Sequence, residues 1–225
     1  MSLPGCKAEG FVLAGGLSSR MGRDKPVIEI AGRALILYAL EILREAGLEA
    51  RIAGARSDLS EFAPVISDSP EESGLGPLAG ICAGLAKCRC QFTAFLPVDQ
   101  PLIPASLIEF LVHHAVVTEA AVTVVSVAEF VQPFPAIVDR AALASLKASL
   151  LSGDRNCLKA FRGAGNSMDG SFNVLPLELL VQSGQVLHPR ALHPSQWYLN
   201  VNTPEDLKLL EETMAGAGRR MRCLQ

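Results

Sequence analysis

The sequence lacks the long apolar run that a membrane-spanning helix requires. Hydrophobic residues make up 49% of the 225 residues, but no uninterrupted apolar stretch reaches the roughly 18 residues needed to cross a bilayer. Lys7 and Glu9 precede the first short apolar stretch, which is not the pattern of a signal peptide. We therefore expect a cytoplasmic protein that has no membrane partner.

The sequence also lacks a large excess of charge of either sign. Charged residues make up 19% of the chain and the net charge is −3, so no basic field favours a nucleic-acid partner. The apolar fraction is typical of a globular chain, and the length allows a substantial core. We predict one domain with its core at 8–215. A flexible tail is expected at 216–225, where three arginines follow two glycines.

The six cysteines include no Cys-x-x-Cys pair. The nearest approach is Cys88-Arg89-Cys90, and a structural zinc ion would need two further ligands close by. The cysteines therefore do not predict a zinc site.

Strand-like apolar segments alternate with helix-like segments through the first half of the chain. The expected strands cover 10–14, 50–53, 63–66, 92–96 and 120–127, and the expected helices cover 34–46, 77–86 and 104–114. Such alternation is typical of a parallel sheet with helices on both faces. We therefore predict an α/β fold, a single Rossmann-like three-layer domain with a mainly parallel central sheet.

The second half is less regular. We expect a short strand at 135–138, a helix at 140–151, a helical turn at 156–162 and a strand at 197–199. The glycines and prolines of 163–194 predict loops or a small accessory lobe. Thr203 and Pro204 are a good N-cap and first residue for a helix that runs to about Met214.

A glycine-rich segment directly follows the first expected strand. Its sequence from Leu13 to Lys25 is LAGGLSSRMGRDK. Glycines let the backbone N–H groups approach a polyphosphate, and Arg20 and Lys25 add positive charge there. A Walker loop would have Gly-Lys where this segment has Gly22-Arg23, and the glycine spacing does not fit a dinucleotide-binding fingerprint. An ordinary glycine turn is the alternative.

This segment resembles the signature of the molybdenum cofactor guanylyltransferases, within the wider nucleotidyltransferase superfamily. That family transfers GMP from GTP to molybdopterin and releases pyrophosphate. The related cytidylyltransferases usually have Leu-Ala-Ala-Gly and lack the Asp before Lys, so Gly15 and Asp24 favour the guanylyl branch. The resemblance implies that Arg20 and Lys25 are catalytic. It also implies that this segment binds the nucleotide through Leu13, Ala14, Gly15, Gly16 and Lys25.

Asp68 and the Gly74–Gly80 segment extend the resemblance. The sequence GLGPLAG matches a turn of the family, and Asp68 resembles its guanine-contacting acid. A carboxylate can accept both the N1–H and the 2-amino group of guanine. The implied nucleotide contacts here are Asp68, Gly76, Pro77 and Leu78. The alternative for Asp68 is a cap in a loop rich in Ser, Asp and Pro.

Asp99 follows another apolar strand, in the sequence LPVDQPLI. It resembles the metal-binding and catalytic carboxylate of the family, which would also contact the nucleotide. A carboxylate at the carboxyl end of a parallel strand suits Mg²⁺ bound against phosphate oxygens. The residue after it is Gln100, which departs from the commonest residue of the family. The alternative is that Asp99 only organises a proline-flanked turn.

Two further segments complete the resemblance. QPFPA at 132–136 resembles a segment on the acceptor side of the site, and NVNTPEDL at 200–207 resembles a motif near the metal and phosphates. The implied acceptor-side residues are Gln132, Pro133, Asn200 and Asn202, and Asn202 is also an implied metal ligand beside Asp99. Part of the second motif has a simpler alternative, because Thr203-Pro204 starts a helix by itself.

The function expected from these motifs is Mg²⁺-dependent transfer of GMP from GTP to molybdopterin. An acceptor phosphate would attack the α-phosphorus and pyrophosphate would leave, which needs positioning and charge neutralisation more than a protein nucleophile. Transient contact with proteins that deliver or accept the cofactor is also expected. The alternatives are a cytidylyl- or sugar-nucleotidyltransferase of the same superfamily and a non-catalytic nucleotide-binding module.

Overall fold

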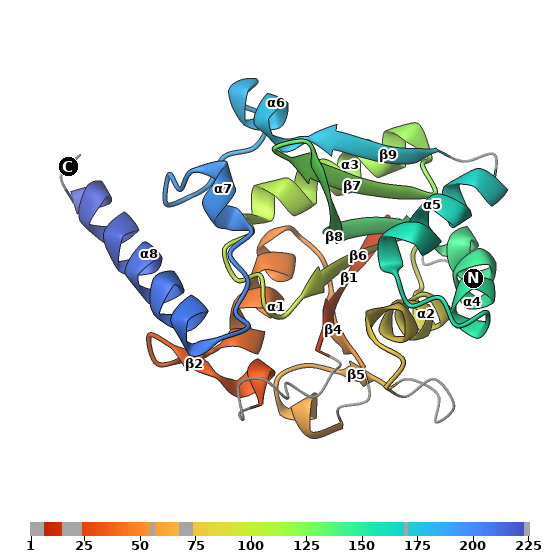
Figure 1. The fold of residues 1–225 in the computed structure, drawn as a ribbon, viewed down its shortest axis with the longest axis horizontal. Helices are drawn as coiled ribbons and strands as arrows, with labels where there is room; N and C mark the ends of the chain where they lie inside the picture. Colours follow the sequence, from red (N-terminus) through yellow and green to blue (C-terminus); the bar gives the residue numbers. More distant parts are fainter. Residues whose placement is uncertain (1–6, 15–23, 55–56, 68–73, 169–170, 223–225) are drawn as a thin grey trace.

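The computed structural model describes residues 7–14, 24–54, 57–67, 74–168 and 171–222, with the side chains of 217–222 excepted (Figure 1). Seven strands form the central sheet: β1 (Ala8–Leu13), β4 (Ala50–Ala53), β5 (Val65–Ile66), β6 (Phe92–Pro97), β7 (Val122–Val127), β8 (Phe130–Asp139) and β9 (Phe172–Pro176). A separate hairpin contains β2 (Glu29–Ile30) and β3 (Arg33–Ala34).

Eight α-helices lie in the described ranges. They are α1 (Leu35–Glu45), α2 (Pro77–Lys87), α3 (Ala105–Thr118), α4 (Leu143–Leu151), α5 (Cys157–Ser167), α6 (Leu177–Gln182), α7 (Pro194–Trp197) and α8 (Pro204–Arg222). Three short 3₁₀ helices accompany them: η1 (Lys25–Val27), η2 (Ser57–Glu61) and η3 (Arg140–Ala142). None of these helices combines the length and the apolar character that a membrane crossing requires, within the part of the chain that the structure describes.

The strand order of the sheet is β5-β4-β1-β6-β8-β7-β9. Parallel pairing joins β5 to β4, β4 to β1, β1 to β6 and β7 to β9. Strand β8 pairs antiparallel with both of its neighbours. Among the described strands it alone opposes the common direction, so the prediction of a mainly parallel sheet is confirmed.

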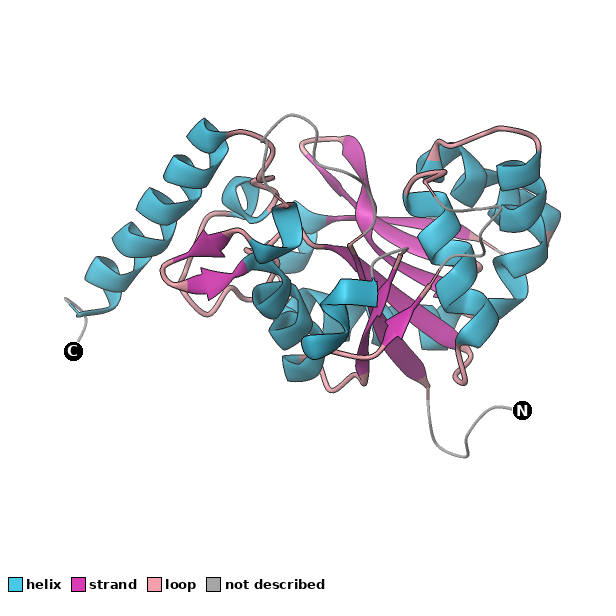
Figure 2. Cartoon of the chain, turned by 90° about the horizontal axis from the view of Figure 1, so that it is seen from below, coloured by secondary structure: helices cyan, strands magenta, loops and turns pink. Residues whose placement is uncertain are grey.

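Alternate residues of the strands point to opposite faces of the sheet. In β1, Val12 packs into a core with helices α1 and α3, whereas Phe11 and Leu13 pack into a core with α2, α4 and α5. Figure 2 shows the helices on the two sides of the sheet. Each β1 residue from Glu9 to Leu13 is buried, because neither face is left open to water. The three-layer prediction is therefore confirmed.

The second half is more ordered than the sequence predicts. Within 163–194, which was expected to be loops or an accessory lobe, lie the end of α5, strand β9 and helix α6. The expected strand at 197–199 is wrong, because Trp197 ends the short helix α7. Its ring is 1% exposed, and its Nε1–H donates to the Leu192 carbonyl at 3.0 Å. The apolar residues at 197–199 therefore reflect packing rather than strand pairing.

Helix α8 lies at the edge of the molecule beside the β2–β3 hairpin (Figures 1 and 2). It begins at Pro204, as expected, and its backbone continues past Met214 to Arg222. The residues at 216–222, which we expected as part of a flexible tail, therefore have a helical backbone.

Two glycines of α5 allow a matched test of packing. A Cβ at Gly163 would meet nothing within 4 Å, whereas one at Gly165 would lie 2.9 Å from the Phe172 Cβ and 3.1 Å from its backbone N. We expect Gly163→Ala to stabilise the protein by about 0.5–1 kcal/mol through helix propensity. Gly165→Ala should destabilise it by about 1–3 kcal/mol, because β9 would have to move. Denaturant unfolding measures both, and equal effects at the two positions would contradict this packing.

Candidate active site

The site forms where the strand order reverses. From β1 the chain proceeds to β4 and β5 on one side, whereas β6 lies on the other side of β1. The ends of the two strands are in register, because Leu13 pairs with Pro97. The Val98 N–H also donates to the Leu13 carbonyl at 3.2 Å. Open α/β sheets bind ligands at such a point, outside the carboxyl ends of the strands.

Asp99 is held by a turn that follows β6 directly. The Gln100 N–H donates to the Pro97 carbonyl at 3.3 Å, which closes the turn around Val98 and Asp99. Val98 is buried and anchors the turn to the core, whereas the Asp99 side chain is 24% exposed. The turn therefore presents a partly exposed carboxylate at the edge of the sheet, as the sequence predicts.

Lys25 connects Asp99 to a third segment of the chain. Its Nζ donates to Asp99 Oδ2 at 3.1 Å and to Asn202 Oδ1 at 2.7 Å. The Lys25 side chain is 17% exposed, so the ammonium sits partly out of water between the two oxygens. Three residues that lie far apart in the sequence, and that were expected to act together, are thus brought into direct contact.

The start of α8 fixes the backbone at Asn202. Asp206 accepts hydrogen bonds from the N–H groups of Asn202 and Thr203 at 2.9 and 2.8 Å, and its own N–H donates to Thr203 Oγ1 at 3.1 Å. This arrangement is a reciprocal helix cap. The Val201 N–H donates to the Asp99 carbonyl at 3.2 Å, so the segment is also tied to the turn that carries Asp99.

A cavity of about 420 Å³ opens beside Lys25 and Asp99. Its size falls in the range of small-molecule sites. Among the expected site residues, it is lined by Leu13, Ala14, Lys25, Pro77, Asp99, Gln132, Pro133 and Asn200. Residues from all five of the motifs quoted in the sequence therefore share one cavity.

The remaining expected site residues have different positions. Gly76 precedes helix α2 with a φ of +89°, and the Leu78 side chain is fully buried in the core. Leu78 therefore exposes no surface to the cavity and does not line it. Asn202 lies beside the cavity through its bond to Lys25. Gly15, Gly16, Arg20 and Asp68 lie outside the described residues, so their expected contacts stay predictions.

Other cavity residues were not in the expected set. They are Pro26, Pro97, Val98, Gln100 and Phe134. Pro97, Val98, Gln100 and Phe134 lie within the quoted motifs LPVDQPLI and QPFPA, so their neighbours in the sequence were the available signal. Pro26 lies outside the quoted motifs and directly follows Lys25.

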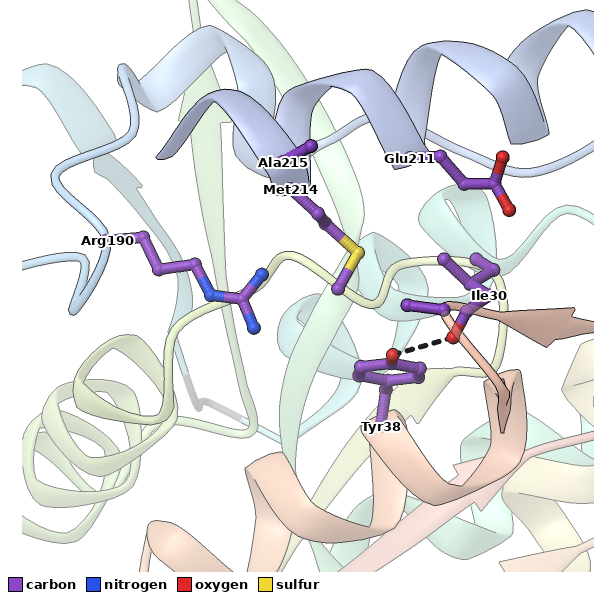
Figure 3. A pocket seen from close by; sticks show the side chains of 7 residues that line it. Ile30, Tyr38, Arg190, Glu211, Met214 and Ala215 are labelled. Carbon is purple, nitrogen blue, oxygen red and sulfur yellow. Dashed lines mark hydrogen bonds between the residues drawn. The ribbon is translucent and has the colours of Figure 1, made fainter. Parts of the chain in front are cut away.

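A larger cavity of about 620 Å³ lies elsewhere, between the β2–β3 hairpin, α1 and α8. Figure 3 shows Met214 of α8 pointing toward Tyr38 of α1, whose hydroxyl donates to the Ile30 carbonyl at 2.9 Å. Arg190 and Glu211 also line this cavity, but Lys25 and Asp99 do not. The smaller cavity is therefore the candidate active site, because Lys25 and Asp99, the charged groups of the expected chemistry, line it and do not line the larger one.

Asp99 and Asn202 both offer oxygen atoms, which suit a hard cation. No group of three or more His, Cys, Asp or Glu side chains in the described residues could hold a metal ion. A protein-only metal cage is therefore not formed there. A metal ion there would share the two oxygens with the Lys25 ammonium, which already binds both, and would take most of its ligands from phosphates and water.

The chain is similar to known proteins over most of its length. A model of the MobA-like NTP transferase domain matches residues 10–167. A molybdenum cofactor guanylyltransferase of Shewanella piezotolerans is 28% identical over 220 residues, which covers 96% of this chain and 97% of the relative. Its counterpart in Vibrio cholerae is 33% identical over 189 residues, covering 79% of this chain and 91% of the relative.

Solved structures share the fold. The molybdopterin-guanine dinucleotide biosynthesis protein A of Archaeoglobus fulgidus superposes with a TM-score of 0.74 at 22% identity, covering 92% of this chain and 99% of that one. A CMP:2-keto-3-deoxy-manno-octonic acid synthetase in complex with CTP has a TM-score of 0.68 at 16% identity, with 93% and 99% covered. At these identities the likeness concerns the arrangement of the chain.

The capping carboxylate generates a prediction for stability. Hydrogen bonds from the backbone N–H of Asn202 and then from that of Thr203 hold the pKa of Asp206 below its ordinary value, and the positive charge of the nearby Lys25 lowers it further. Its stabilisation is therefore present above the unfolded-state pKa and is lost as the pH falls through the lower folded-state pKa. Asp206→Ala should lower the melting temperature at pH 7, and the difference from wild type should shrink below about pH 4.

Glu205→Ala is the matched control for that prediction. Glu205 is an exposed acidic residue in the same helical turn, so its removal takes away a similar charge near the helix N-terminus. It should cost less stability than Asp206→Ala. A difference between wild type and Asp206→Ala that stays constant from pH 7 to 3 would contradict a role for the ionised carboxylate.

Proposed function

Because the chain belongs to the MobA-like NTP transferase family, we propose that it transfers GMP from GTP to molybdopterin and releases pyrophosphate. The two relatives named above are molybdenum cofactor guanylyltransferases, and the match to the one from Shewanella piezotolerans covers nearly the whole length of both chains. The observation that carries the proposal is the contact of Lys25 with both Asp99 and Asn202 at the wall of the cavity. A domain that only bound nucleotide would not need this charged junction.

The cavity has two sides that suit two substrates. On one side are Leu13, Ala14 and Pro77, at the end of β1 and the start of α2. The N-terminal end of a helix favours negative charge, so the nucleotide is assigned to this side. On the other side are Gln132, Pro133 and Phe134 from β8, and the acceptor is assigned there.

Charge at the junction fits the chemistry of transfer. An oxygen of the acceptor phosphate forms a bond to the α-phosphorus, the bond to the bridging oxygen breaks, and pyrophosphate carries the electron pair away. Negative charge develops on the phosphate oxygens during this displacement. The Lys25 ammonium, held in a partly buried place by Asp99 and Asn202, is positioned to neutralise it. No side chain is required as a nucleophile.

Mg²⁺ is proposed as the divalent cofactor. Asp99 and Asn202 would hold it, with phosphate oxygens and water as further ligands. When bound, it supplies positive charge that polarises the phosphate groups. The Asp206 cap serves this arrangement indirectly, because it fixes the backbone that carries Asn202.

The remaining expectations belong to this proposal. Arg20, Gly15 and Gly16 would contact the phosphates and Asp68 the guanine. A cytoplasmic location and transient contact with proteins that deliver or accept the cofactor stay predictions.

Removing the charge of Asp99 should stop catalysis but leave the fold intact. Asp99→Asn keeps the shape of the side chain, so the turn and its backbone bonds should survive. We expect turnover to fall about a hundredfold or more, since a neutral amide holds Mg²⁺ less tightly than a carboxylate and the positive charge that stabilises the transition state is lost. Steady-state pyrophosphate release at several Mg²⁺ concentrations is the measurement.

Asp154→Asn is the control, because Asp154 also forms an ion pair, with Lys159 at 2.9 Å, but does not line the cavity. Wild-type rates for Asp99→Asn at limiting Mg²⁺ would remove Asp99 from the metal site.

Product identification tests the whole proposal. The protein is incubated with molybdopterin, Mg²⁺ and either GTP, CTP or ATP, and the products are separated and identified by mass spectrometry. We expect a guanine dinucleotide of molybdopterin with GTP, and much less product with the other triphosphates. A cytosine dinucleotide as the main product would place the protein among the cytidylyltransferases. Transfer to a sugar phosphate but not to molybdopterin would also contradict the proposal.

A further inference from the structure

Gln100 is a buried polar side chain with an unsatisfied atom. The residue is 6% exposed and follows Asp99 directly. Its backbone N–H closes the turn by donating to Pro97. Its side-chain Oε1 is buried and has no hydrogen-bond partner among the described residues. Folded proteins pair nearly all such groups, so an unpaired acceptor at a cavity wall points to a ligand.

The position of Gln100 favours one side of the cavity. Strand β6 runs antiparallel to β8, and Phe95 of β6 pairs with Ala136 of β8. Continuing past β6 therefore brings the turn at Asp99 and Gln100 alongside Gln132 to Phe134. The cavity is lined by both groups. Gln100 thus lies on the side that we assign to the acceptor, next to β8.

The other amide on this side is already engaged. Gln132 Nε2 donates to the Phe130 carbonyl at 3.1 Å within its own strand. Gln100 Oε1 is an acceptor, so it cannot pair with an unprotonated phosphate oxygen, which is also an acceptor. The terminal torsion of a Gln side chain is broad, so a partial rotation can expose Oε1 to the cavity without exchanging the places of Oε1 and Nε2. The group it suits is an N–H or O–H donor beyond the phosphate of the acceptor.

We propose that Gln100 is a specificity-determining residue for the acceptor, whose ring N–H or O–H donates a hydrogen bond to Gln100 Oε1. The inference rests on the proposed function, because it takes molybdopterin as the acceptor. Before binding, the buried oxygen is unpaired at some cost in stability, and the acceptor relieves that cost. An acceptor that carries the phosphate but lacks the donor leaves the oxygen unpaired and is disfavoured.

Gln100→Met tests this role, because it keeps the length of the side chain and removes both polar groups. At saturating GTP, the KM and the directly measured Kd for molybdopterin should each rise about tenfold, the effect of losing one well-placed hydrogen bond. The Kd for GTP, measured by calorimetry, should not change. The melting temperature of the ligand-free protein should stay equal or rise, because an unpaired buried oxygen has been removed. Gln100→Leu repeats the measurement if Gln100→Met does not fold.

Thr123→Val is the matched control. Thr123 Oγ1 is also buried without a hydrogen-bond partner in the described residues, but it lies in β7 and does not line the cavity. Its replacement should leave both substrate affinities unchanged. An unchanged molybdopterin Kd in Gln100→Met would overturn the inference, as would a parallel rise in the Kd for GTP. A wild-type protein that binds molybdopterin but forms no guanylated product would overturn the proposed function alone, because the Kd comparison stands without turnover.

Discussion

The pairing of Lys25 with Asp99 and Asn202 is the interaction on which the candidate site depends. It joins the end of the glycine-rich segment, the turn after β6 and the start of α8. Lys25 or Asp99 alone would be a partly buried charged group with a cost of desolvation. Together they compensate one another, and the ammonium remains within reach of the cavity. The same contact that satisfies these groups in the free protein therefore keeps positive charge where phosphates are expected.

The sheet explains why these segments can meet. Strands β1 and β6 are parallel neighbours, so their carboxyl ends lie at the same edge. The strand order reverses at this point, which is where open sheets bind ligands. The antiparallel strand β8 then brings Gln132 to Phe134 to that edge. One reversed strand thus adds a second wall to an otherwise parallel arrangement.

Stability and function use the polar groups of the site in different ways. Asp206 accepts two backbone N–H groups through Oδ2 and holds the local structure around Asn202. Gln100, which lines the cavity next to Asp99, has a buried oxygen that the described residues leave unpaired. A satisfied polar group fixes the backbone, whereas an unsatisfied one is available for a ligand. This contrast separates the support of the site from its proposed recognition surface.

Local patterns in the sequence determined much of this protein. The alternation of apolar runs with helical spacing predicted the strands and helices of the first half, since each depends on residues close in the chain. The motifs at Lys25, Asp99 and 200–207 predicted residues that do meet, and the Thr203-Pro204 start of α8 is where the sequence placed it. The tertiary structure decided the rest. Strand β9 exists through its pairing with β7, and Trp197 is buried in a short helix, because long-range contacts override weak local preference. The cavity wall formed by Pro97, Gln100 and Phe134 likewise arises only where β6 and β8 lie side by side. No sequence pattern specifies that approach, because it is made between residues distant in the chain.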